Sequence, residues 1–296
     1  MGKITVDDMT RPSSNNSITR EPLDDTKLFL GIDFGTSVVK GSVIDNGGKP
    51  IVSDSFFRKD FSFDSTRYEL DPDQIWWEEF SNLTRSLISR LGARSENIRS
   101  MCITGMVPNI VLVDSKGSPL RKALLYFDGR ARDIEEKLDK ITGTPKPLNQ
   151  VLSQLIWLKD DMGDQWNSVY KILSTHNYIA YRLTGKFYTD TVTALECGNM
   201  VENERMEWNR KLLSSHGLDV EKLPDILPPT SVLGYISGKY ADELGLTENV
   251  QVVAGTTDIV ATFIGFGAHK KSDMMVSYGT YGCAPMLKYD IEKILK

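Results

Sequence analysis

The alternation of apolar and polar residues predicts strands and helices along most of this chain. Leu28 to Ile32 and Val38 to Ile44 are rich in apolar and β-branched residues, which favours two strands around a short glycine turn. A further strand is predicted from Ile98 to Thr104. The segments Ile110 to Asp114 and Ala123 to Phe127 flank a turn-forming sequence and predict another hairpin.

Helical spacing of apolar residues marks the segments between these strands. Asp71 and Pro72 suit the cap and first turn of a helix in which Trp76, Phe80 and Leu83 recur at intervals of three and four. Such a stripe is typical of a packed core rather than of a ligand platform. Further helices are predicted at 133–138, 148–158, 178–183 and 208–215.

The carboxy-terminal part repeats the arrangement of strand, glycine turn and strand that is predicted near the beginning. Val250 to Ala268 predicts a buried strand, a polar turn that holds Asp258, and a helix of small apolar residues. Met274 to Leu287 predicts a strand, a glycine turn and a second strand. A cleft with two phosphate-holding sides requires such a repeated hairpin.

Composition and charge exclude several classes of protein. With 296 residues, 40% of them hydrophobic, the chain suffices for one large or two modest domains. Its net charge of −5 gives no basic field for nucleic acid, so a small metabolite is the expected partner. No apolar stretch is long enough to cross a bilayer, and the first residues lack the apolar centre of a signal peptide. We therefore expect a cytoplasmic protein without membrane contact.

Cysteine and histidine give no framework of disulfides or metal ligands. Cys102, Cys197 and Cys283 are few, odd in number and far apart, which fits a reducing compartment. None of the 3 histidines has a Cys or His partner at metal-ligand spacing.

The turn after the first strand is a candidate phosphate site. Gly35, Thr36 and Ser37 let backbone N–H groups approach an anionic oxygen closely. Asp33 would face a phosphate-bound metal, and Lys40 would add a positive charge. A plain hairpin with a glycine turn is the alternative.

Three segments resemble motifs of the FGGY carbohydrate kinases, members of the superfamily of sugar kinases and actin-like ATPases. They are Asp33-Phe-Gly-Thr-Ser37, Gly255-Thr-Thr-Asp258 and Ser277-Tyr-Gly-Thr-Tyr-Gly282. Segments 68–77, 125–130 and 181–185 also resemble motifs of the family, both in their residues and in their order along the chain. The resemblance therefore covers roughly residues 27 to 287.

The resemblance implies a fold and a division of the chain. It implies an α/β, ribonuclease H-like domain over residues 27–269, with a mixed central sheet flanked by helices, as in the actin-like ATPase fold. Residues 1–26 would form a flexible polar tail. Residues 270–296 would only begin a second, similar, ATP-binding domain. The chain would then be the substrate-binding half of a kinase and inactive by itself.

The resemblance also implies ATP and Mg²⁺ as cofactors and assigns roles to residues. Asp258 would accept the proton of the attacking sugar hydroxyl, with a helix N-cap as the alternative. Asp33 would hold Mg²⁺ through water, with a turn cap as the alternative. The candidate contacts to the ATP phosphates are Gly35, Thr36, Ser37, Lys40, Gly279 and Thr280.

Sugar recognition is assigned to three candidates. Asp128 belongs to a motif that often lines the sugar pocket in the family, although turn chemistry before a glycine also explains it. Met106 lies in the loop where pentulose kinases commonly show Gly-Gln-Met-His-Gly, and Pro108 stands where that histidine would be. Asn109 would supply a replacement hydrogen bond or merely enter the next strand.

Three hypotheses of function remain. The leading one is ATP-dependent phosphorylation of a sugar or polyol hydroxyl, with a pentulose such as xylulose as the first candidate substrate and a homodimer as a candidate assembly. The second is a non-catalytic sugar-binding or regulatory module with the kinase fold. The third is an actin-like ATPase that uses nucleotide as a switch.

Overall fold

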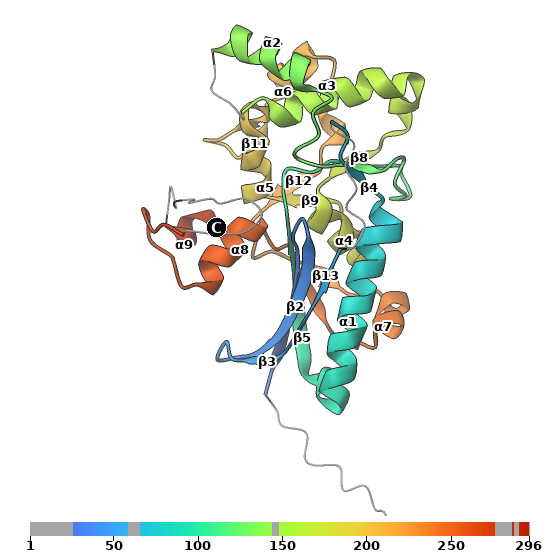
Figure 1. Cartoon of the computed structure of the whole chain (residues 1–296), viewed down its shortest axis with the longest axis vertical. Coiled ribbons are helices and arrows are strands. Elements are labelled where there is room, and N and C mark those ends of the chain that lie inside the picture. Colours follow the sequence, from blue (N-terminus) through green and yellow to red (C-terminus); the bar gives the residue numbers. More distant parts are fainter. Residues whose placement is uncertain (1–25, 59–65, 144–147, 276–285, 287–289, 296) are drawn as a thin grey trace, which may run out of the picture.

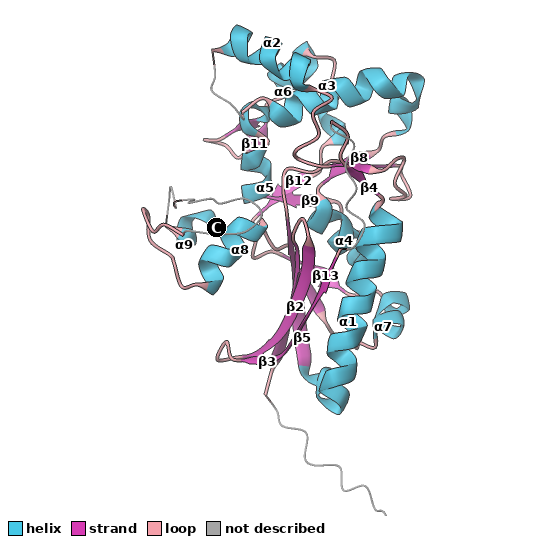
Figure 2. Cartoon of the chain, in the orientation of Figure 1, coloured by secondary structure: helices cyan, strands magenta, loops and turns pink. Residues whose placement is uncertain are grey.

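A six-stranded mixed sheet forms the centre of the molecule (Figures 1 and 2). The computed structural model describes residues 26–58, 66–143, 148–275, 286 and 290–295. The strand order is β13-β14-β5-β1-β2-β3. The strands are Leu28–Phe34 (β1), Val38–Asp45 (β2), Pro50–Phe57 (β3), Ile98–Gly105 (β5), Val232–Tyr235 (β13) and Gln251–Val253 (β14).

Parallel and antiparallel pairs combine in this sheet. The first three strands form an antiparallel meander. By contrast, β1 and β5 run parallel, as do β5 and β14. The carboxyl ends of β1, β5 and β14 therefore share one edge of the sheet.

Helices flank the sheet and form a separate layer beyond its carboxyl edge (Figure 1). The α-helices are Glu78–Leu91 (α1), Arg132–Thr142 (α2), Gln150–Met162 (α3), Thr175–Thr184 (α4), Thr191–Glu196 (α5), Arg210–Ser215 (α6), Gly238–Leu244 (α7), Asp258–Gly265 (α8) and Ile291–Ile294 (α9). Shorter helical turns span Pro72–Trp77, Gly92–Asn97, Gly163–Ser168, Gly198–Met200 and Val220–Lys222. The short strands are Glu69–Leu70 (β4), Val111–Val113 (β6), Ala123–Leu124 (β7), Lys171–Leu173 (β8), Tyr188–Asp190 (β9), Val201–Glu202 (β10), Glu207–Trp208 (β11) and Asp225–Leu227 (β12).

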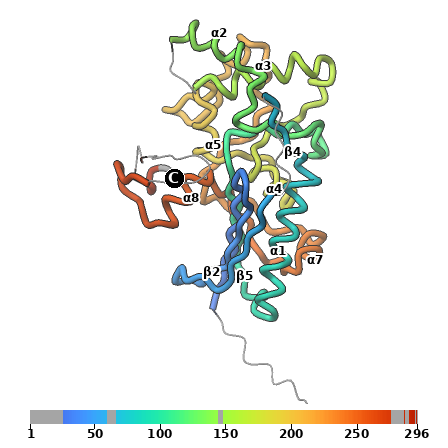
Figure 3. Tube along the Cα trace, viewed as in Figure 1, coloured from blue at the N-terminus to red at the C-terminus, as the bar shows by residue number. Residues whose placement is uncertain are grey.

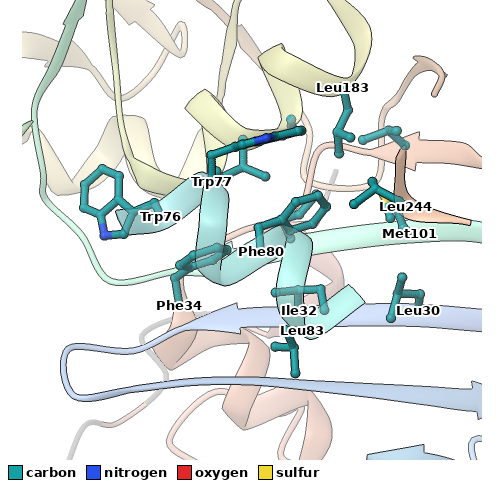
Figure 4. Packing of buried hydrophobic residues seen from close by; sticks show 14 of the residues in the cluster. Leu30, Ile32, Phe34, Trp76, Trp77, Phe80, Leu83, Met101, Leu183 and Leu244 are labelled. Carbon is teal, nitrogen blue, oxygen red and sulfur yellow. The ribbon is translucent and has the colours of Figure 1, made fainter. Parts of the chain in front are cut away.

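The main core lies between the sheet and α1. Figure 4 shows Ile32 and Phe34 of β1 facing Phe80 and Leu83 of α1. Each such fully buried side chain stabilises the fold by about 1.5–3 kcal/mol. The contact is close because β2 has Gly41 beneath the helix, where a Cβ would lie 2.7–2.8 Å from side-chain carbons of β1 and α1.

A second apolar cluster holds the outer layer together. It joins buried residues of α3, α6 and the loops around them, among them Leu152, Leu155, Trp166, Met200 and Leu213. The chain thus buries one core against the sheet and another among the helices beyond its carboxyl edge.

Most predicted elements are confirmed, with two corrections. The segments 110–114 and 123–127 share only a short antiparallel contact between Ile110 and Leu124, because β6 pairs with β8 and β7 pairs with β4. The helix predicted at 208–215 begins at Arg210, since Trp208 belongs to β11 and its Nε1 donates to the carbonyl oxygen of Pro224 at 2.7 Å.

Two predicted segments lie outside the described residues. They are the polar tail, apart from Thr26, and nearly all of the second glycine hairpin. Met274 and Met286, which flank that hairpin, form an antiparallel bridge. In the part of the chain that the structure describes, no helix combines the length and the apolar character needed to traverse a bilayer.

Candidate active site

Three loops meet where β1, β5 and β14 end. The Met106 N–H donates to the carbonyl oxygen of Phe34 at 2.9 Å, and Gly105 forms a parallel bridge with Thr257. Segments far apart in the sequence, drawn in blue, green and orange-red in Figure 3, are joined at this edge. Ligands of open α/β sheets bind outside the carboxyl ends of the strands, so this edge is the candidate site.

Asp258 is the first residue of α8 and does not cap it. Thr257 is the N-cap, because its side chain accepts from the Val260 N–H at 3.4 Å. The Asp258 carboxylate accepts a hydrogen bond from the adjacent Ile259 N–H at 2.8 Å. Burial raises its pKa, the charge of Asp33 raises it further, and these effects outweigh the hydrogen bond. The N-cap alternative therefore does not account for Asp258.

A glycine sets the path of the loop that carries Asp258. Gly255 has a φ of +76°, and a Cβ there would lie 2.1 Å from the carbonyl oxygen of Ile103. Only glycine tolerates both this conformation and this approach to β5. The loop is thereby pressed against the sheet edge.

Asp33 is held between two neighbouring strands. Its Oδ1 accepts from the Thr104 hydroxyl at 2.9 Å, and its Oδ2 lies 2.8 Å from Lys40 Nζ. Asp33 and Lys40 face each other across the hairpin register. Both lie on a groove of about 840 Å³ that also touches Thr262 of α8. The carboxylate is thus bound to strands β2 and β5 rather than capping its own turn.

The glycine turn between β1 and β2 is fixed from its carbonyl side. Arg58 donates from Nη1 to the Gly35 carbonyl oxygen at 3.1 Å and to that of Thr36, and its backbone N–H donates to that of Ser37 at 2.9 Å. Glu79 of α1 pairs with the same guanidinium at 2.6 Å. Arg58 could not be recognised from the sequence, because its role arises from contacts with residues more than 20 positions away.

A buried polar pair lies behind the site. His176 Nε2 is 2.9 Å from Asp190 Oδ2, and both side chains are fully buried. Asp190 also caps α5 by accepting from the N–H groups of Val192 and Thr193. The charge of His176 acts to lower the pKa of Asp258. No spacing in the sequence predicts that His176 and Asp190 form a pair.

The sugar candidates are occupied by partners within the protein. Both oxygens of Asp128 accept from Arg130, and one also accepts from the Tyr68 N–H at 2.8 Å. The Asn109 amide donates to the Met106 carbonyl oxygen and to Thr175, and accepts from the Tyr126 N–H. The Met106 side chain is buried. These contacts support the alternatives to sugar binding, in which Asp128 stabilises its turn and Asn109 leads into the next strand.

The described residues constrain how a metal could bind. Among them, no three or more His, Cys, Asp or Glu side chains are grouped so as to hold a metal ion. Mg²⁺ usually keeps several waters and needs only one or two carboxylates, so a lone Asp33 fits a water-mediated role. Gly279 and Thr280 lie outside the described residues.

Comparisons with known proteins show the family of this chain. The family description "FGGY family of carbohydrate kinases, N-terminal domain" matches residues 28–265. A xylulose kinase of Staphylococcus xylosus is 28% identical over 86% of this chain and 54% of its own length. One of Bacillus subtilis is 25% identical over 90% and 54%. The chain thus spans about half the length of the curated relatives it matches.

Solved structures share the fold. A gluconate kinase from Lactobacillus acidophilus superposes with a TM-score of 0.79 at 24% identity, over 88% of this chain and 54% of that one. A ligand-bound xylulose kinase from the same organism gives a TM-score of 0.78 at 24% identity, over 87% and 54%. The mixed sheet flanked by helices is therefore the fold of the sugar kinases.

Proposed function

Because the chain belongs to the FGGY family of carbohydrate kinases, we propose that it is the substrate-binding half of an enzyme that transfers a phosphoryl group from ATP to a sugar or polyol hydroxyl. The observation that carries this proposal is the position of Asp258. Its carboxylate stands at the shared carboxyl edge of three strands, is not used as a helix cap and lies within electrostatic reach of Asp33. A pentulose such as xylulose is the leading substrate, since xylulose kinases are among the relatives.

In this proposal Asp258 is the general base. A carboxylate whose pKa lies above its usual range accepts a proton more readily than an ordinary aspartate does. Its backbone is fixed by Gly255 and by the first turn of α8, so the reactive oxygen is positioned before substrate binds.

The turn and its neighbours form the proposed phosphate side. ATP, with Mg²⁺, supplies the transferable phosphoryl group and the charge neutralisation that this chemistry requires. Asp33 would hold the metal through water, and Gly35, Thr36, Ser37 and Lys40 would contact the phosphates. Lys40 has an exposed side chain and can leave Asp33 for a phosphate oxygen without breaking a buried contact. Gly279 and Thr280, which lie outside the described residues, remain proposed contacts to the phosphates.

A second candidate function is a sugar-binding or regulatory module without turnover. It is favoured by the internal contacts of Asp128 and Asn109, which leave fewer groups to hold a substrate in a reactive position.

Sugar-dependent ADP release by the full-length protein, across ketoses, polyols and sugar acids, distinguishes the two functions. We expect turnover with a ketose and a loss of at least about 100-fold in kcat for Asp258→Asn, as for the removal of a general base. Asp160→Asn, on the exposed surface of α3, is the matched control and should keep full activity. Binding of a sugar without turnover would favour the regulatory module, and turnover that survives Asp258→Asn would refute the assigned base.

A further inference from the structure

Tyr126 lies between the two parts of the candidate site that the proposed function assigns to phosphate and to sugar. Its hydroxyl is 3.2 Å from the hydroxyl of Thr36, in the glycine turn between β1 and β2. Its backbone N–H donates to the side-chain oxygen of Asn109 at 3.0 Å. Tyr126 and Thr36 are 90 positions apart in the sequence, so only the fold brings them together.

The surroundings of Tyr126 hold both its ring and its backbone in place. The ring meets that of Phe127 edge to face, with centroids 4.5 Å apart. Gln150 of α3 donates to the Tyr126 carbonyl oxygen, and the Asn109 side chain that accepts from its N–H is buried. The phenolic hydroxyl is therefore presented to the glycine turn from a fixed position.

The Thr36 hydroxyl gains an orientation from this contact. The Thr36 carbonyl oxygen already accepts from Arg58, which fixes the backbone of the turn on its other side. A hydroxyl has one proton to donate and two lone pairs that accept, whereas a phosphate oxygen only accepts. If Thr36 donates its proton to a phosphate, its oxygen is left to accept from Tyr126. The contact between the two hydroxyls is partly buried, so competition from water is reduced.

We propose that Tyr126 is a positioning residue for ATP, which donates its hydroxyl proton to the Thr36 oxygen and thereby directs the Thr36 hydroxyl toward a phosphate oxygen. This inference rests on the proposed function and adds a residue to its phosphate side. Hydrogen bonds in such a chain strengthen one another, and the bond that ends on a charged phosphate is the stronger kind. Tyr126 acts through Thr36 and does not itself contact the nucleotide.

The test measures the dissociation constant of a non-hydrolysable ATP analogue, with Mg²⁺, for the full-length protein. We expect Tyr126→Phe to weaken binding about three- to tenfold, because one hydrogen bond of the chain is lost while the ring stays. In a Thr36→Val background the same change should have no further effect, since Tyr126 acts through the Thr36 hydroxyl. Independent, additive losses in the double variant would overturn the proposal.

Tyr181→Phe is the matched control. It removes a tyrosine hydroxyl that donates to the Lys116 carbonyl oxygen at 3.0 Å, away from the glycine turn. The dissociation constant of the ATP analogue should not change in this variant. A loss as large as that of Tyr126→Phe would mean that the effect is not specific to the contact with Thr36.

A merely structural role for Tyr126 would produce a different pattern. General loosening around this residue would weaken the binding of sugar as well as of nucleotide, because its backbone is bound to Asn109. Tyr126→Phe keeps that N–H, so we expect the dissociation constant of the sugar that the wild type phosphorylates to stay unchanged. Equal losses for sugar and nucleotide would refute the positioning role.

A readout in this chain needs neither ATP nor turnover. The NMR resonance of the Tyr126 ring carbon that bears the hydroxyl reports hydrogen bonding there, and it should shift in Thr36→Val. An unchanged resonance would show that the two hydroxyls do not interact and would overturn the inference alone. Failure of the wild-type protein to bind the ATP analogue or any sugar would overturn the proposed function, and this inference with it.

Discussion

Asp258 carries a charge that the fold holds partly away from water and near a second carboxylate. Both effects raise its pKa, so its ionised form is less stable in the folded protein than in the unfolded chain. The cost is fully present above its folded-state pKa and disappears below the ordinary aspartate range. The fold tolerates this cost in stability because the proposed reaction needs the carboxylate.

Asp258→Asn should therefore stabilise this chain at neutral pH. The expected gain in unfolding free energy is about 0.5–2 kcal/mol, the usual range for relieving a strained site. The gain should fade as the pH falls through the folded-state pKa and vanish below about 3, where the carboxyl is protonated in both states. Urea unfolding at a series of pH values measures it, with Asp160→Asn as the neutral control. A variant that is less stable at pH 8, or a gain that does not vary with pH, would contradict the assigned environment.

Gly255→Ala tests the contact that positions the Asp258 loop. The added Cβ would meet a backbone oxygen at 2.1 Å, so we expect a loss of about 3 kcal/mol or more. Gly185→Ala is the matched control: its φ is +74° in the left-handed region but nothing lies within 4 Å, so it should cost only about 1–2 kcal/mol. Thermal unfolding compares the two, and equal losses would mean that the loop relaxes away from β5.

At the scale of elements, the sequence pattern predicted the helices and strands that depend on residues close together in the chain. The strands around the first glycine turn and the helix after Asp71 follow from periodicity and capping, and Asp71 does accept from the N–H groups of Asp73 and Gln74. Strands of two or three residues, such as β6 and β7, have too little local signal to fix their partners, so packing chose β8 and β4.

The residues of the candidate site fall into the same two groups, those revealed by adjacent residues and those that depend on distant contacts. The turn at Gly35 and the position of Asp258 could be recognised from adjacent residues. Arg58 and His176 could not, because each acts through residues far away in the sequence.

Asp190 joins the cap of α5 to the buried pair with His176. Asp190→Ala removes both and should cost about 3–5 kcal/mol, because it leaves a buried imidazole without its partner. Asp190→Asn keeps a capping oxygen and should lose less. Asp219→Ala, an exposed cap of a short helical turn, should cost only about 0.5–1 kcal/mol and serves as the control. Chemical denaturation measures the unfolding free energies of the three variants. If Asp190→Ala loses no more stability than Asp219→Ala, the proposed link between the α5 cap and the buried pair is refuted.

At the scale of the whole molecule, Glu69 ties distant segments together. Its buried carboxylate pairs with Arg67, Arg121 and Arg130. Burial alone would raise the pKa of Glu69, but the hydrogen bond and charge of Arg130, with the bonds from the other arginines, lower it. A lowered pKa means that this stability is present above the ordinary glutamate range and is lost as the pH falls through the folded-state value.

Glu69→Gln should thus weaken the protein at neutral pH by about 2 kcal/mol, since it removes charge-assisted hydrogen bonds. The difference from the wild type should shrink under acid conditions. Glu202→Gln is the control, because the Glu202 carboxylate forms an ion pair with the exposed Arg205 at 3.7 Å; it should change stability by less than about 0.5 kcal/mol. Unfolding free energies at pH 7 and pH 4 test this, and a difference that grows with acid would reverse the sign assigned to Glu69.

The proposed function requires that Asp258 is a partly desolvated carboxylate that faces the bound sugar. Carboxyl NMR of Asp258, titrated with and without xylulose in the full-length protein, tests it most directly. We expect a pKa above the ordinary aspartate range and a resonance that shifts when the sugar binds. An ordinary pKa, together with a resonance that no sugar affects, would contradict it.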